Sequence, residues 1–289
     1  MVADVLALVL LQLAAGLAAC TLLSSSKDLS GGFFALHGLI GTVALALSWL
    51  VSGNAGILLR REEGKPVQGA AAALWGQPWF AGALFAVALA ALVGHTLVAR
   101  AGSAAFLTLS KNLLFVSAFS STCLLVTRAG VEPFVSLPGL GPVWLAAGLL
   151  LGALLFGAVV WAMNLGHWYL VSASLPSGLL VRATEAFALL VLLRAAFAAV
   201  ALGVVARASA GEGGEALARL LDPMRDGFFF WSRVTWGLLA PLLLAPFVVK
   251  TARMKSNQAA TGLLYVGLVF VLVGELLAAY LTRRSGLPV

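Results

Sequence analysis

About eight long apolar runs dominate this sequence, each of roughly twenty residues or more. An α-helix needs about 20 apolar residues to cross the hydrocarbon core of a bilayer. Lipid offers no hydrogen-bond partners, so a single segment can span it only as a helix that satisfies its own backbone groups. We therefore predict an all-α fold, a polytopic transmembrane helical bundle made by a single domain over residues 1–289. The predicted spans are 3–23, 33–59, 79–99, 103–127, 143–170, 179–206, 228–249 and 258–281.

The composition supports a lipid environment. Hydrophobic residues make up 62% of the chain and charged residues only 10%, against roughly a quarter in soluble domains. The net charge of +7 comes from Lys and Arg near the ends of the spans, where they contact lipid headgroups. No basic patch with interleaved aromatic residues indicates nucleic-acid binding. We expect a multi-pass protein of a prokaryotic plasma membrane whose first partner is the lipid bilayer.

Basic residues also bear on orientation, because cytoplasmic loops carry an excess of Lys and Arg. Their distribution favours the N-terminal side as cytoplasmic, whereas the short loop Lys250–Lys255 argues for the opposite side. The segments between the spans are short, so chemistry in water is expected to come from partner chains.

Ionisable residues inside a bilayer are costly, and each is a candidate for function. Following the alternating direction of the helices, one group of polar residues falls near the side opposite the N-terminus. Such a group suits a quinone headgroup, which needs hydrogen-bond donors to its carbonyl oxygens and a proton-exchanging group beside them. We expect His167 or Glu185 to exchange the proton and Lys111 or Asn164 to donate. The expected quinone-binding residues, for menaquinone or ubiquinone, are His37, Lys111, Asn164, His167 and Arg182.

Structural roles remain open for several of these residues. His37 and His95 could be interfacial residues at helix ends, and Arg182–Glu185 could be an ion pair, since residues three apart share a helix face. A single haem b held by His37 and His95 is a further alternative that we consider unlikely. No CxxC spacing exists around the two cysteines, so no metal site is predicted.

A second group lies deeper, toward the N-terminal side: Arg194, Arg233 and Glu275. The last two spans are joined by a short loop, so an Arg233–Glu275 pair is geometrically reasonable. A buried charge without a partner is costly, which makes structural pairing the plain expectation. The functional alternative is a proton route from the quinone site. Glu185 and Arg194 lie on opposite faces of one helix and are expected to make different contacts.

The run Gly274-Glu275-Leu276-Leu277-Ala278-Ala279-Tyr280-Leu281, together with eight spans in under 300 residues, resembles the membrane anchor subunits of the NrfD (polysulfide reductase) and dimethyl-sulfoxide-reductase type. The resemblance implies a haem-free subunit that binds quinol and passes electrons to an iron–sulfur or cytochrome c partner. Of the candidate residues, only Glu275 is carried over by position. The leading hypothesis is a quinone-interacting anchor subunit of a respiratory electron-transfer complex, at most the quinol-binding part of an oxidoreductase. A transporter or channel, or a structural membrane subunit without a ligand, are the alternatives.

Overall fold

The computed structural model describes residues 2–24, 29–51, 78–101, 104–129, 141–172, 175–176, 178–207, 218 and 220–285, and all regular secondary structure among them is helical. The long helices are α1 (Val2–Leu23), α2 (Gly31–Val51), α4 (Pro78–Ala101), α5 (Ala104–Ala129), α6 (Gly141–Val171), α7 (Gly178–Arg207) and α11 (Asn257–Ser285). Between α7 and α11 the chain forms α9 (Gly227–Ser232), the π-helix η1 (Arg233–Leu239) and α10 (Ala240–Arg253). The prediction of an all-α fold is confirmed.

Seven helical segments in the described part of the chain are long and apolar enough to cross a membrane. They correspond to seven of the eight predicted spans, with most ends within a few residues of the expected ones. The remaining predicted span, 103–127, is the fourth along the chain. It forms α5, a helix of 26 residues that is not among the seven. Residues 52–59 of the second predicted span lie outside the described residues.

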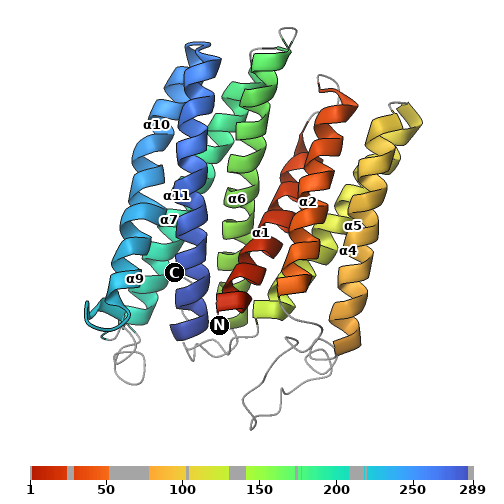
Figure 1. The fold of residues 1–289 in the computed structure, drawn as a ribbon. Helices are drawn as coiled ribbons and strands as arrows, with labels where there is room; N and C mark the ends of the chain where they lie inside the picture. The colour runs from red at the N-terminus through yellow and green to blue at the C-terminus, as the bar shows by residue number, and fades with distance from the viewer. Residues whose placement is uncertain are drawn as a thin grey trace. The chain divides into compact units, whose positions relative to one another are not determined.

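The first of two compact units comprises Met1–Gly130. Its helices α1, α2, α4 and α5 pack each against the next, and α5 packs back against α1, so they close a ring of four (Figure 1). Ser48 of α2 donates a hydrogen bond of 2.8 Å to the Ala7 carbonyl of α1. The interior is lined by apolar side chains such as Leu11, Phe33 and Leu92, each at most 1% exposed.

The second unit, Val131–Val289, repeats this order of packing. Helix α6 packs against α7, α7 against α10, α10 against α11, and α11 back against α6. Each unit is thus a four-helix ring in which chain neighbours are also spatial neighbours. That both units act as the single transmembrane domain expected from the sequence stays a prediction.

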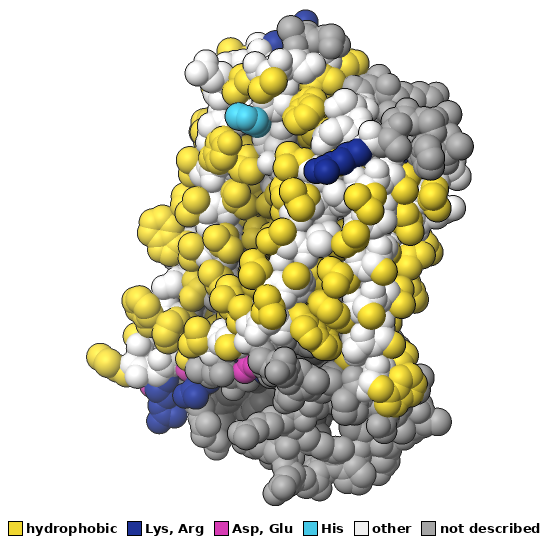
Figure 2. All heavy atoms as spheres, turned by 45° about the vertical axis from the view of Figure 1, so that its right-hand side comes forward, with side chains coloured by type: hydrophobic (Ala, Val, Ile, Leu, Met, Phe, Trp, Pro, Cys, Tyr) yellow, Lys and Arg dark blue, Asp and Glu magenta, His cyan; other side chains and the backbone are white. Residues whose placement is uncertain are grey.

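Large apolar side chains on the outside of the helices indicate that lipid surrounds the protein. Phe115, Phe119, Leu243, Phe247 and Val269 are 57–68% exposed, and Figure 2 shows a face on which hydrophobic side chains predominate between its two ends. Contiguous apolar surface on this scale is unfavourable in water. Together with the seven apolar helices, it defines a polytopic membrane protein embedded in lipid.

The predicted span 228–249 is longer than expected and is not a regular helix. It runs from Gly227 to Arg253 and contains the π-helical turns of η1, in which the Ala240 N–H bonds the Thr235 carbonyl, five residues back. Pro241 explains the irregularity, because its ring clashes with the carbonyl four residues earlier and it has no N–H to donate. A wider turn before the proline relieves that clash.

Candidate functional site

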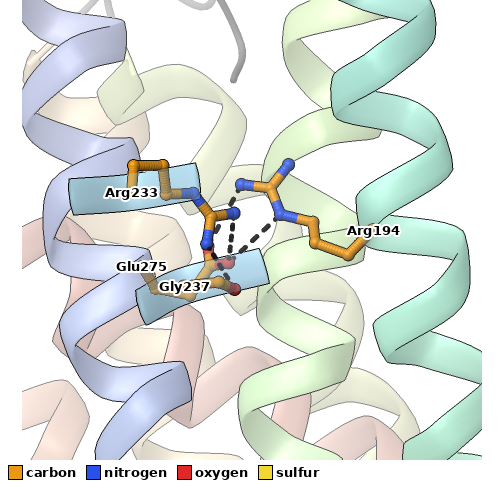
Figure 3. Close-up of polar contacts among 4 residues, drawn as sticks. All are labelled: Arg194, Arg233, Gly237 and Glu275. Atoms are coloured by element: carbon orange, nitrogen blue, oxygen red, sulfur yellow. Dashed lines mark hydrogen bonds and ion pairs between the residues drawn. The ribbon is translucent and has the colours of Figure 1, made fainter. Parts of the chain in front are cut away.

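Three charged side chains meet in the interior of unit 2, one from each of α7, η1 and α11 (Figure 3). Arg194 donates from Nε and Nη2 to the two carboxylate oxygens of Glu275, at 3.1 and 3.3 Å. Arg233 donates from Nη2 to Oε1 of the same carboxylate at 3.3 Å. The three side chains are at most 3% exposed. We call Arg194, Arg233 and Glu275 the ion cluster.

The backbone carbonyl of Gly237 is a further hydrogen-bond partner of the ion cluster, and Pro241 leaves this carbonyl available. In an α-helix the Gly237 carbonyl would accept from the N–H of residue 241, which a proline lacks. Arg233 fills that place, donating from Nη1 to the Gly237 oxygen at 2.9 Å. Arg233 therefore has two roles. It donates a hydrogen bond to a carbonyl that lacks its α-helical N–H partner, and it pairs with the carboxylate of Glu275.

Two glycines allow the backbones of η1 and α11 to touch at this point. A Cβ added to Gly237 would lie 2.6 Å from the Gly274 Cα, and one added to Gly274 would lie 2.6 Å from the Gly237 Cα. Both added atoms would also meet Nη1 of Arg233. Since real Cβ atoms do not approach backbone this closely, glycine at both positions is what brings Glu275 within reach of Arg233.

The ion cluster holds two guanidinium groups and one ionised carboxylate, so it carries surplus positive charge. Glu275 is the only acidic residue between Asn257 and Ser285. Arg233 Nε is buried and makes no hydrogen bond to the described residues. Chemically, the arrangement can lock three helices together, and it presents buried donors and a carboxylate in the apolar interior of a bilayer.

The Arg233–Glu275 contact expected from the short α10–α11 connection is present, and Arg194 joins it. Glu185 does not join the ion cluster. The sequence suggested this, because Glu185 and Arg194 lie on opposite faces of α7. Oε1 of Glu185 accepts from Nη2 and Nε of Arg253 on α10, at 2.7 and 3.3 Å. That ion pair lies at the solvent-facing end of unit 2, with side chains 42% and 64% exposed.

The other unit 2 candidates lie where α6 ends and α7 begins. His167 and Arg182 are exposed, and Asn164 is half-buried. Gly166 lies directly against the Thr261 side chain of α11, so the end of α6 is fixed in place. The Tyr169 hydroxyl donates to the Pro176 carbonyl in the following turn. His167 is thereby held on a rigid helix end with its ring outside the unit.

In unit 1, His95 of α4 ties together three helices. Its Nε2 bonds the Phe34 carbonyl of α2 at 3.1 Å, so this nitrogen carries the proton. Its Nδ1 then accepts from the Ser110 hydroxyl of α5 at 2.7 Å. Gly38 makes room, because a Cβ there would lie 2.7 Å from the imidazole Cδ2. The residue is fully buried, not interfacial.

His37 is also buried, and its Nδ1 bonds the Phe33 carbonyl one turn earlier at 2.8 Å. Lys111 of α5 is exposed, next to the buried Ser110. For His95 to ligate a haem iron, the contacts of one of its two ring nitrogens would have to break. Within the described residues, no group of three His, Cys, Asp or Glu side chains is placed to hold a metal ion.

Sequence reasoning did not identify Ser110, Gly237 and Arg253 as partners in these contacts. It also did not predict that Gly274 allows a close backbone contact. One signal was available: Pro241 lies four residues after a glycine and eight after an arginine within an apolar run. This spacing marks an orphaned carbonyl one turn from a potential donor.

Comparison with known proteins adds no identity: no family model, no curated protein and no solved structure matches this chain. Its class is therefore defined by the fold alone, as a polytopic α-helical membrane protein.

Proposed function

We propose that this chain is an integral membrane subunit of a multi-subunit respiratory electron-transfer complex in a prokaryotic plasma membrane. It would anchor redox partners and interact with quinone and quinol. One observation carries the proposal: within the run that resembles NrfD-type and dimethyl-sulfoxide-reductase-type anchors, Glu275 belongs to the ion cluster and Gly274 lies directly beside it. Gly274 allows the close contact with Gly237, and Glu275 binds both arginines. The resembling residues are thus the ones that organise the interior of unit 2.

The quinone contact is assigned to the end of α6. Quinones diffuse within the bilayer, so their headgroup needs a polar side chain that faces lipid at the helix ends. His167 is exposed there, and Asn164 is one turn deeper on the same helix face. The imidazole exchanges the proton and the amide donates to a carbonyl oxygen. Lys111 is a comparable exposed donor in unit 1.

In this proposal the partner chains hold the metal centres that accept electrons from quinol. A quinol that becomes a quinone releases two electrons and two protons. The electrons pass to an iron–sulfur cluster or to a cytochrome c haem held by a partner. This chain's residues bind and orient the headgroup and accept the protons, and the ion cluster either relays protons or holds the helices that carry the site.

Mass spectrometry of the proteins that copurify after gentle detergent extraction tests the proposal. An iron–sulfur, molybdopterin or multihaem cytochrome partner is expected. A chain that is stable, colourless and alone would contradict it.

A transporter is the second candidate, favoured by the π-helical interruption inside the span Gly227–Arg253. Transport sites are often built where a spanning helix is discontinuous. Solute uptake by vesicles that contain the purified chain alone would favour this candidate over the first.

A further inference from the structure

Exposed cations gather at one end of unit 2, where α6 and α10 end and α7 and α11 begin. They are Arg182, Lys250, Arg253 and Lys255. Glu185 is the only acidic residue in the sequence stretches 164–190 and 243–265, and Arg253 already binds it at 2.7 Å. This end of unit 2 therefore presents more positive charge than its own side chains neutralise.

The Glu185–Arg253 ion pair joins α7 and α10, which pack against each other and run in opposite directions. Arg182 lies one turn before Glu185, about 4.5 Å nearer the helix end. Lys250 lies one turn before Arg253, about 4.5 Å deeper in the bilayer. Two further cations thus flank the ion pair, one on each helix, within the reach of long flexible side chains.

An exposed apolar stripe continues from each of these cations into the membrane. On α7 it follows Arg182 through Ala186, Leu189 and Leu193, at spacings of four, three and four residues. On α10 it runs from Lys250 through Phe247 to Leu243. Leu189, Leu193, Phe247 and Leu243 are 55%, 43%, 62% and 68% exposed. On each of these two adjacent helices, an exposed cation therefore lies at the end of an exposed apolar stripe.

We propose that this surface binds one anionic phospholipid. Arg182 and Lys250 hold its phosphate beside the Glu185–Arg253 ion pair, and its acyl chains lie along the two apolar stripes. The stripes distinguish a lipid from an acidic protein, because a partner docked at the membrane surface would contact the cations and leave the apolar residues to the bilayer. This assignment is independent of the quinone proposal and gives Arg182 to the phosphate instead of the quinone.

Native mass spectrometry tests the site, using protein released from vesicles of equal phosphatidylglycerol and phosphatidylcholine. Wild-type protein should retain phosphatidylglycerol over phosphatidylcholine. Each Lys or Arg at a membrane surface strengthens binding to anionic lipid by a factor of about five. The double variant Arg182→Gln/Lys250→Gln should therefore lower phosphatidylglycerol retention roughly 25-fold.

The matched control is Arg207→Gln/Arg225→Gln, which removes the same charge from exposed positions that belong neither to this group of cations nor to the two stripes. It should retain the lipid as the wild type does. The exchange Arg182→Lys/Lys250→Arg keeps both charges and should restore retention, which separates a lost site from a misfolded chain.

Three outcomes would overturn the proposal. The wild type could show no preference for phosphatidylglycerol, or the control could lose as much lipid as the site variant, which would indicate unspecific charge attraction. In the third, the site variant keeps the lipid but loses an acidic protein that copurifies with the wild type, which would make this surface a protein interface.

Discussion

Replacing Glu275 by glutamine probes the ion cluster directly. The carboxylate accepts from Arg194 at 3.1 and 3.3 Å and from Arg233 at 3.3 Å, and all three side chains are at most 3% exposed. Glutamine keeps the shape but loses the charge, and one of its terminal atoms becomes a donor. The two buried guanidinium groups would then lose the negative charge of Glu275. Removing one partner of a buried ion pair costs about 3–5 kcal/mol, and we expect Glu275→Gln to destabilise the protein by that amount.

A double-mutant cycle with Arg194 separates charge from packing. Arg194→Met leaves the neutral Arg233–Glu275 pair intact and should cost less than Glu275→Gln. Combined with Glu275→Gln, it removes one of the two guanidinium groups that lose the charge of Glu275, so the double variant should be less destabilised than the sum of the two single variants. The coupling expected for residues in one buried network is about 1–3 kcal/mol.

The assay is equilibrium unfolding in mixed micelles, followed by tryptophan fluorescence. Glu185→Gln is the matched control, because it makes the same chemical change in an ion pair that is 42% and 64% exposed. Exposed pairs contribute at most about 1 kcal/mol. If Glu275→Gln and Glu185→Gln have the same small effect, the ion cluster does not stabilise unit 2 and the reasoning is refuted.

Three further predictions concern backbone contacts and hydrogen bonds. Gly274→Ala would place a Cβ 2.6 Å from the Gly237 Cα. In the same unfolding assay this overpacked contact should lower the free energy of unfolding by roughly 1–3 kcal/mol. An unchanged stability would contradict the close contact. Pro241→Ala returns an N–H to the Gly237 carbonyl, so the π-helical turns should become α-helical, seen as faster spin-label motion or altered distances across unit 2 by electron paramagnetic resonance; unchanged distances would show that the proline is not the cause. His95→Phe removes the hydrogen bonds to two neighbouring helices and strands the Ser110 hydroxyl, which should cost about 1–3 kcal/mol, whereas His167→Phe at an exposed position should leave unfolding unchanged.

The helices could be predicted from the sequence because lipid enforces one solution. A span must be apolar over about 20 residues and must satisfy its own backbone, so hydropathy alone placed the ends of α1, α6, α7 and α11 within a few residues. The π-helical segment could not be read in the same way, because Pro241 and Gly237 are apolar and leave the hydropathy unchanged. Its signal is a missing N–H, which is a matter of backbone bonding.

Contacts between distant residues were partly predictable. The Arg233–Glu275 pair followed from the short α10–α11 connection, which forces antiparallel packing at a known depth. The partner of Glu185 was not found, because Arg182 lay closer in sequence and Arg253 was counted only as a loop charge. Charge pairing across helices depends on which helices are neighbours in space, whereas the sequence shows only their order along the chain. The quinone roles of Lys111, Asn164 and His167 stay predictions.

Electron paramagnetic resonance of the complex purified through this chain, before and after addition of quinol, tests whether this chain connects quinol to redox partners. We expect quinol to reduce an iron–sulfur centre or a haem of the partner chains, and His167→Gln to slow the reduction without loss of assembly. If dithionite reduces the centre but quinol does not, this chain does not connect quinol to its partners, and the proposed function is wrong.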